Sequence, residues 1–275
     1  MRRTRMNRNR TLNTVVTFLI ISLIFVGSGY LIGRFLLSSL FQRQPKGEPV
    51  SGNKDKTPAP SSYTAQIELK PLTIYRIQIG AYSSKENAEK TAEAAMAKGV
   101  SAFVMSPDPL YKVYCGVTGS KEAAAKISES VLPKLAGTVI AKDDKPYIAT
   151  LEIPSRSFSI TGDKAQVESI QKAVTSFVNA LQSLVSFWDA HYLGQQSQVN
   201  LAAMESDIAA LKNDLAKITP DANLKDAYET CISILSELEA AIRGAKEAQG
   251  GDSAKVTAGM TQLIKLVDIY NREIK

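Results

Sequence analysis

The N-terminal part of the chain is dominated by one long apolar run. From Val15 to Ile32 no residue carries a charge, and beyond Arg34 the apolar run continues to Phe41. Roughly 20 consecutive apolar residues in a helix cross the hydrocarbon core of a bilayer. The pattern therefore predicts a transmembrane helix over residues 15–41.

The charges that flank this run predict its direction. Residues 1–14 contain five arginines and no acidic residue, and such a basic segment stays in the cytoplasm. A cleaved signal peptide is the rival interpretation, but the apolar run continues beyond the small residues 27–29 and no A-x-A site follows. We expect a single-pass protein of the cell membrane with a cytoplasmic N-terminus. Under both interpretations everything after Phe41 lies outside the cytoplasm.

Residues 42–72 show almost no apolar periodicity and hold five prolines together with several glycines and serines. A segment of this composition cannot bury a core, and it predicts a semi-extended linker. About 30 residues span roughly 30 Å on average as a flexible coil and at most about 100 Å when stretched. The linker can therefore hold a domain away from the membrane.

An internal repeat follows the linker. The segment that begins at Tyr75, YRIQIGAYSSKENAEK, is similar to the one that begins at Tyr111, YKVYCGVTGSKEAAAK. Each copy predicts a strand, a glycine turn, a helix with a serine N-cap and a short second strand. The second strands are expected at 100–105 and 138–141. Two such halves predict an α+β domain over 73–142, with a ferredoxin-like βαββαβ sheet, both helices on one face and the other face open.

Four helical patterns fill the last part of the chain. After a connecting segment over 143–162, apolar residues recur at three- and four-residue spacing, with breaks at Gly194, Pro220 and Gly250. This pattern predicts an antiparallel helical bundle over 163–275. The bundle could be a docking surface for other proteins, a dimerising element, or a self-contained fold, because the spacing specifies packing and not a partner.

Charge and chemistry narrow the functional classes. The net charge of +6 equals the six arginines of residues 1–41, so the folded part has no basic surplus and a nucleic-acid partner is not expected. Cys115 and Cys231 lie in different predicted domains at apolar positions, and we interpret both as buried hydrophobic residues. His191, the only histidine, accompanies no catalytic motif and is interpreted as solvated or capping. No enzyme activity, metal or cofactor is expected.

The segment YRIQIGAYSSKENA resembles the opening of a SPOR (sporulation-related repeat) domain, and YKVYCG resembles the second-half motif of that family. The resemblance covers residues 73–142. It implies binding of septal peptidoglycan, specifically of glycan strands stripped of stem peptides, on the open sheet face. Where the family usually continues with Gly-Pro-aromatic, this chain has Val117 and Thr118 after Gly116, which puts contacts near that turn in doubt.

The alternation of the strands assigns side chains to the two faces. Ile77, Ile79, Val113 and Cys115 are expected to face the helices, because residues two apart share a face. An amide, cations and aromatic rings on the open face suit a glycan, whose hydroxyls need donors and acceptors and whose ring CH groups lie against aromatics. The two glycines leave room for a polymer. The predicted glycan-binding residues are Arg76, Gln78, Gly80, Tyr82, Phe103, Lys112, Tyr114 and Gly116.

The sequence thus predicts a non-enzymatic, membrane-anchored protein that reads denuded glycan strands at the division or sporulation septum. The first alternative is a membrane-tethered scaffold that acts through protein contacts of the helical bundle, for which the resemblance implies division or sporulation proteins as partners. A second is an RNA-recognition-like module, which shares the βαββαβ topology but needs a cytoplasmic location and stacking aromatics on its first strand, where Arg76 and Gln78 stand.

Overall fold

The computed structural model of the chain describes residues 62–105 and 109–273. They belong to one compact unit, Pro58–Lys275. The predicted cytoplasmic tail, the transmembrane helix over 15–41 and most of the predicted linker lie outside the described residues. Among the helices that are described, none combines the length and the apolar character needed to cross a membrane.

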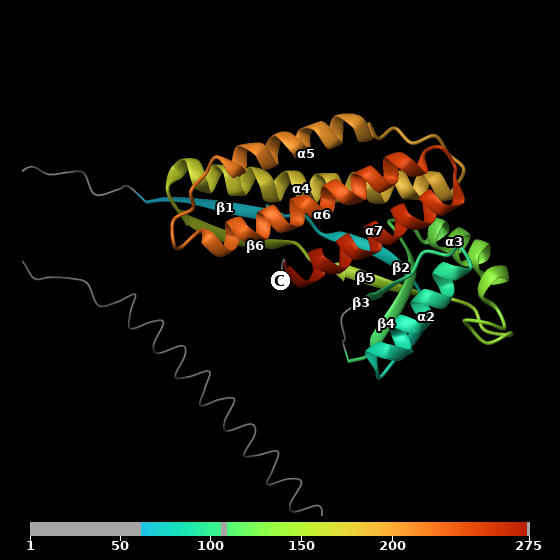
Figure 1. The fold of residues 1–275 in the computed structure, drawn as a ribbon. Helices are drawn as coiled ribbons and strands as arrows, with labels where there is room; N and C mark the ends of the chain where they lie inside the picture. Colours follow the sequence, from blue (N-terminus) through green and yellow to red (C-terminus); the bar gives the residue numbers. More distant parts are fainter. Residues whose placement is uncertain (1–61, 106–108, 274–275) are drawn as a thin grey trace, which may run out of the picture. The chain divides into compact units, whose positions relative to one another are not determined.

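The predicted repeat forms a four-stranded antiparallel sheet with the order β3-β4-β2-β5 (Figure 1). Its strands are β2 (Leu72–Tyr82), β3 (Phe103–Met105), β4 (Tyr111–Thr118) and β5 (Tyr147–Ile153). Helix α2 (Lys85–Ala97) connects β2 to β3, and helix α3 (Lys121–Leu135) lies between β4 and β5. This strand order is that of the predicted ferredoxin-like βαββαβ topology.

The two helices begin at the serines that the repeat singled out. The side chain of Ser84 accepts a hydrogen bond from the Asn87 N–H, and that of Ser120 accepts one from the Ala123 N–H. Both interactions satisfy a backbone donor of the first helical turn. Small alanines on the buried faces of both helices allow close packing on the sheet.

The fourth strand was expected in the wrong place. Residues 138–141 form a turn with one isolated bridge between Ala136 and Ile140, and Gly137 adopts a φ of 75° there. The strand that pairs with β2 is β5, whose register runs from Ile153 opposite Leu72 to Tyr147 opposite Gln78. The predicted strand of four residues is too short for this pairing, which extends over seven residues of β2. The turn at 138–141 precedes the longer edge strand β5.

A separate two-stranded sheet comes from segments that the sequence analysis assigned to the linker and the connecting segment. Strand β1 (Tyr63–Leu69) pairs antiparallel with β6 (Arg156–Gly162), from Tyr63 opposite Gly162 to Leu69 opposite Arg156. Alternate residues of β1 are buried, and β1 contacts α4. Regular secondary structure is therefore present about ten residues before the predicted domain boundary at residue 73.

This pairing makes the four-stranded sheet an insertion between β1 and β6. Only Lys70 and Pro71 separate β1 from β2, and only Pro154 and Ser155 separate β5 from β6. The two connectors lie side by side, because Leu69 pairs with Arg156 and Leu72 pairs with Ile153. The chain therefore crosses between the two sheets twice at the same place.

Four helices complete the described part: α4 (Lys164–Tyr192), α5 (Leu201–Ala216), α6 (Lys225–Ala248) and α7 (Ser253–Glu273). They form the predicted bundle (Figure 1). Helices α6 and α7 approach most closely at Gly244 and Gly259, where a Cβ built on Gly259 would lie 2.6 Å from the Gly244 carbonyl oxygen. Glycine at both positions lets the two backbones touch.

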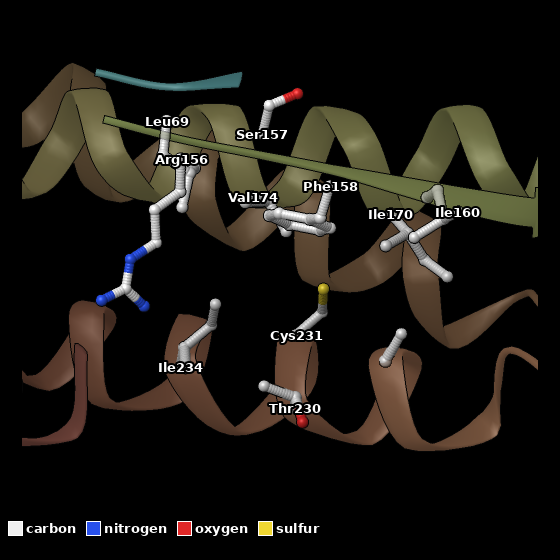
Figure 2. A pocket seen from close by; sticks show the side chains of 11 residues that line it. Leu69, Arg156, Ser157, Phe158, Ile160, Ile170, Val174, Thr230, Cys231 and Ile234 are labelled. Atoms are coloured by element: carbon white, nitrogen blue, oxygen red, sulfur yellow. The ribbon is translucent and has the colours of Figure 1, made fainter. Parts of the chain in front are cut away.

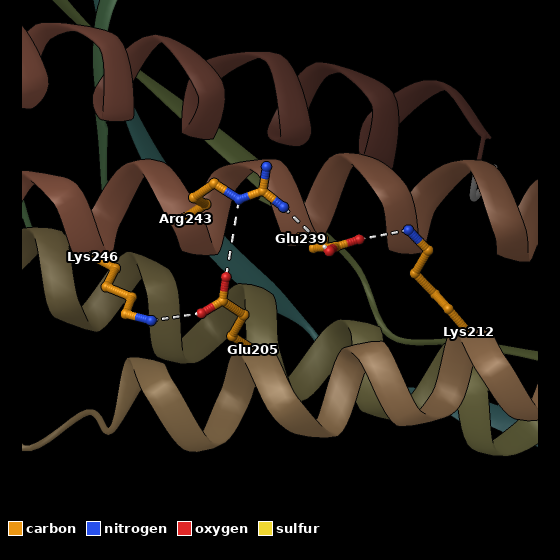
Figure 3. Close-up of polar contacts among 5 residues, drawn as sticks. All are labelled: Glu205, Lys212, Glu239, Arg243 and Lys246. Carbon is orange, nitrogen blue, oxygen red and sulfur yellow. Dashed lines mark hydrogen bonds and ion pairs between the residues drawn. The ribbon is translucent and has the colours of Figure 1, made fainter.

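A polar network links α5 to α6 along the outside of the bundle (Figure 3). Glu205 lies 2.8 Å from the Lys246 ammonium and 3.9 Å from Arg243. Glu239 lies 3.3 Å from Arg243 and 2.5 Å from Lys212. Each carboxylate therefore meets two cations, and pairs of alternating charge connect α5 to α6.

Candidate functional site

Four residues form a row across the sheet on the face predicted to bind glycan. The register places Phe103 opposite Tyr114, Tyr114 opposite Gln78 and Gln78 opposite Tyr147. Directly opposed residues of antiparallel strands share a face. One strand after another therefore contributes an aromatic ring or an amide to the same row.

The β2–β4 register shifts on both sides of Gln78. Ile77 pairs with Gly116, Gln78 with Tyr114, and Gly80 with Val113. Cys115 and Ile79 are therefore each the extra residue of a bulge. Because of these bulges Gly116 lies on the helix-facing side with Ile77, whereas Tyr114 lies on the opposite face, where the sequence placed it.

Much of that opposite face is not open. The last six residues of β4 are all buried, and the strand contacts α2 and α3 as well as α4 and α7. Helix α7 also contacts β3. The expectation of an open sheet face is therefore wrong for its β3–β4 half, because the bundle packs on it.

Tyr114 and Arg76 illustrate the effect of this cover. Tyr114 retains 1% of its exposure, and the Arg76 guanidinium carbon lies 4.8 Å from the centroid of its ring. Arg76 donates a hydrogen bond to the Met105 sulfur at 3.6 Å, while its buried Nε has no hydrogen-bond partner among the described residues. In this arrangement Tyr114 cannot contact a glycan.

The two glycines do not make room for a polymer. A Cβ on Gly116 would lie 3.0 Å from Ile127 on α3 and 3.1 Å from Ile77, so this glycine lets α3 pack on the sheet. A Cβ on Gly80 would lie 2.6 Å from the ring of Tyr82. The space above Gly80 is therefore filled by Tyr82, and the predicted polymer contact at both positions is corrected to close internal packing.

A small cavity of about 310 Å³ lies at the end of β2, beside Tyr147 of β5 and the segment that follows α3. Gln78, Gly80 and Tyr82 line it together with Lys145 and Tyr147. Tyr147 is 65% exposed, which is unusual for a large aromatic side chain. Three predicted site residues are thus brought together here, while Phe103 and Lys112 lie half-buried on the covered half.

The chemistry of this cavity suits a sugar. The Tyr147 ring offers a flat apolar surface, the Gln78 amide can donate and accept hydrogen bonds, and the Lys145 ammonium can pair with a carboxylate. The sequence analysis missed Tyr147 and Lys145 because it ended the domain at residue 142. The alternation of 147–153 was the available signal, since it predicts a strand.

A larger cavity lies away from this sheet (Figure 2). It measures about 640 Å³ and lies between β6, α4 and α6, with apolar walls that include Phe158, Ile160, Val174 and Ile234. Arg156 extends past Leu69 along one end, and the Cys231 thiol points into the space from α6 (Figure 2). The cavity presents an apolar surface with one cationic end.

The remaining reactive side chains are packed. Cys115 and Cys231 are free and buried, as predicted, and burial raises the pKa of both thiols to about 12. His191 is half-buried, with ring centroids of Trp188 and Tyr192 5.5 and 5.3 Å away, and burial lowers its pKa. His191 therefore lies in the last turn of α4 as part of an aromatic cluster, with part of its side chain still exposed.

Comparison with known proteins adds one finding to this geometry. Neither curated proteins nor solved structures gave a match to the chain. One family model does match, and the match covers the four-stranded sheet up to the turn after α3. Residues 71–140 match the family model of the SPOR domain, a peptidoglycan-binding module, which supports the resemblance found in the sequence.

Proposed function

We propose that this chain is a non-enzymatic, membrane-anchored protein that binds denuded peptidoglycan glycan strands and is thereby targeted to the division or sporulation septum. The observation that carries the proposal is the SPOR match together with the cavity that gathers Gln78, Tyr82, Lys145 and Tyr147. Fold alone does not give a function, so the proposal rests on this group of side chains.

The side chains at the cavity support the proposed preference for glycan without stem peptides. Removal of the peptide leaves the lactyl carboxylate of muramic acid, and Lys145 supplies a cation at the cavity. The exposed Tyr147 supplies a surface for the ring CH groups of the next sugar. A stem peptide at the same position would occupy the space beside these residues.

The predicted N-terminal segment supplies the membrane anchor in this proposal. The apolar run of 15–41 and the arginines before it support a single span with the folded unit outside the cytoplasm. The proline-rich residues after it provide the distance to the cell wall.

A pull-down on purified cell-wall sacculi tests the proposal. The fragment 58–275, which is one compact unit, is mixed with sacculi before and after an amidase removes the stem peptides. We expect binding to rise after amidase treatment and to fall in Gln78→Ala and Lys145→Ala variants. Glu229→Ala on α6, far along the chain from the cavity, is the control. Equal binding to both preparations would exclude recognition of denuded glycan.

The scaffold alternative is favoured by one observation, the apolar cavity between β6 and α6 with the 38% exposed Phe158 at its rim. An apolar concave surface of this size is typical of sites for apolar side chains of a partner. Replacing residues 70–155 by an Asn-Gly turn distinguishes glycan binding from the scaffold function. The replacement is feasible because Leu69 and Arg156 are paired and a two-residue turn can join them. Septal localisation that survives this excision favours the scaffold.

A further inference from the structure

We propose that the helical bundle is an autoinhibitory cover of the SPOR sheet: it docks on the β3–β4 half of the glycan-binding face, and it must swing away before a glycan strand can lie across the whole row from Phe103 to Tyr147. This inference rests on the proposed glycan binding and adds its regulation. In the closed form only the β2–β5 half is available.

The cover consists of α7 and the C-terminal part of α4. Helix α7 contacts β3 and β4, and α4 contacts β4. At the start of α7, the Thr257 hydroxyl donates a hydrogen bond to the Gly99 carbonyl in the turn between α2 and β3. At the end of α4, Tyr192 lies close enough to Cys115 for the two groups to interact electrostatically, which adds to the burial that raises the Tyr192 pKa.

The contact between α4 and the turn after β4 is tight. The Gly119 N–H donates a hydrogen bond to Asp189 at 2.9 Å. A Cβ on Gly119 would lie 2.9 Å from Val185 Cγ1 and 3.1 Å from the Asp189 carboxylate. The φ of Gly119 is not positive, so the absence of a side chain here serves the close approach of α4 and not the turn itself.

The connectors provide a hinge for the opening. The inserted sheet is joined to the β1–β6 sheet only by Lys70-Pro71 and Pro154-Ser155, which lie side by side. A domain that is attached through two short adjacent connectors can rotate by small backbone changes at a few residues. The strands on either side of the hinge keep their pairing.

In the closed form the guanidinium of Arg76 is incompletely hydrogen-bonded. The buried Arg76 Nε has no hydrogen-bond partner among the described residues, and a second guanidinium donor meets only the weakly accepting Met105 sulfur. A buried unsatisfied donor of a charged group is expensive. Opening would return this guanidinium to water or to the carboxylate of a muramic acid, which lowers the cost of separating the bundle from the sheet.

Two variants test the cover from opposite directions. Gly119→Leu adds a side chain against Val185 and Asp189 and drives the bundle from the sheet, while Gly250→Leu is its matched control, because a Cβ there meets only one carbonyl oxygen at 4.0 Å. Gly119→Cys with Val185→Cys forms a lock. Val185 Cγ1 lies 2.9 Å from the Gly119 Cβ position, so the two Cβ atoms fall within the roughly 3.5–4.5 Å that a disulfide needs.

Binding of fragment 58–275 to amidase-treated sacculi is the first readout. Apparent affinity scales with the open fraction. We expect Gly119→Leu to bind at least about fivefold more tightly, the lower end of typical coupling effects, and the oxidised lock to bind less than its reduced form. Equal binding by the oxidised and reduced lock overturns the inference.

A second readout needs no glycan. Cys115 interacts with Tyr192 of the covering helix α4, so Gly119→Leu is expected to accelerate the alkylation of Cys115, measured by peptide mass spectrometry with Cys231 as the internal reference. If the wild type binds the sacculi, and Gly119→Leu is alkylated faster but binds no more tightly than the wild type, the inference is overturned. If alkylation accelerates but neither the wild type nor the variant binds, the proposed function itself has failed, and the cover has no ligand to exclude.

Discussion

The guanidinium of Arg76 lies over the ring of Tyr114, with its carbon 4.8 Å from the ring centroid, and Tyr114 is buried on β4, the strand that contacts α4 and α7 of the bundle. Cation–π pairs gain strength when they are removed from water. The pair is therefore a structural contact in the closed form, although both residues were predicted to be ligands. Measurements of stability and of glycan binding distinguish a structural contact from a ligand-binding role.

Tyr114→Ala is expected to lower the free energy of unfolding by about 3–5 kcal/mol, as for other buried aromatic residues. Only 1% of Tyr114 is exposed, so its removal leaves a cavity between two modules. Urea denaturation of fragment 58–275 measures the change. Tyr147→Ala, in the same row but mostly exposed, is the matched control and should shift stability by less than about 0.5 kcal/mol. Similar losses for the two variants would contradict the observed cover.

Arg76→Met is expected to leave stability unchanged or to raise it slightly. Methionine retains the apolar stem and removes the buried Nε that lacks a partner among the described residues, and replacing a poorly satisfied polar group by an apolar one of similar shape is often neutral or stabilising. Arg76→Ala, which also removes the packing of the stem, is the comparison and should be less stable in the same denaturation experiment. A large loss in Arg76→Met would show that the charge itself stabilises the closed form.

Tyr147→Ala is expected to weaken binding to amidase-treated sacculi by roughly tenfold, because an aromatic contact of this kind contributes about 0.5–1.5 kcal/mol beyond its burial. Tyr147→Trp should retain binding, since it keeps a flat ring at the same place. Quantitative sedimentation with increasing amounts of sacculi gives the affinities. Unchanged binding by the alanine variant would show that the glycan does not bind at the cavity beside β2 and β5.

The sequence was sufficient for the elements that depend on local pattern. The repeat at Tyr75 and Tyr111 predicted three of the four strands of the sheet and the two capped helices, because alternation and a serine N-cap are local signals. The same pattern placed Arg76, Gln78 and Tyr114 on one face, and the structure confirms this placement. The helical bundle followed from its three- and four-residue spacing.

The contacts between elements could not be predicted in this way. The segment YKVYCG does not indicate that α7 packs on it. Helix α7 contacts both α6 and the sheet, and the spacing of its apolar residues is the same for either neighbour. The pairing of β1 with β6 joins residues about 90 positions apart, and the alternation of each strand alone does not identify its partner. Gly80 and Gly116 were interpreted as room for a polymer, whereas the neighbours that need the room are Tyr82 and Ile127.

Gly259→Ala is expected to destabilise the bundle by about 1–3 kcal/mol or more. The new Cβ would lie 2.6 Å from the Gly244 carbonyl oxygen, and a backbone atom cannot rotate away, so α6 and α7 must separate. Gly250→Ala, beyond the end of α6, adds the same methyl group with no close neighbour and serves as the control. Thermal unfolding followed by circular dichroism distinguishes the two, and a Gly259→Ala variant as stable as the control would refute the close contact.

The ionisation of Glu239 is expected to make the free energy of unfolding depend on pH. The hydrogen bond from Lys212, followed by the charges of Lys212 and Arg243, lowers the pKa of Glu239, and the carboxylate is about one quarter exposed. A carboxyl group with a lowered pKa stabilises the folded state when it is ionised in both states, and this contribution is lost as pH falls through the folded-state pKa. Glu239→Gln should therefore be less stable than the wild type by up to about 1 kcal/mol at pH 7.

The difference between the two proteins should be constant above about pH 5, because an unperturbed glutamate has a pKa near 4.3, and it should shrink as the pH falls further. Urea denaturation at pH 7, 5 and 3.5 measures it. Glu229→Gln, in an exposed pair with Lys225 on the same helix, is the control for a general effect of removing one charge. A Glu239→Gln deficit that stays the same from pH 7 to pH 3.5 would show that packing of the side chain, and not its ion pairs with Lys212 and Arg243, stabilises the contact between α5 and α6.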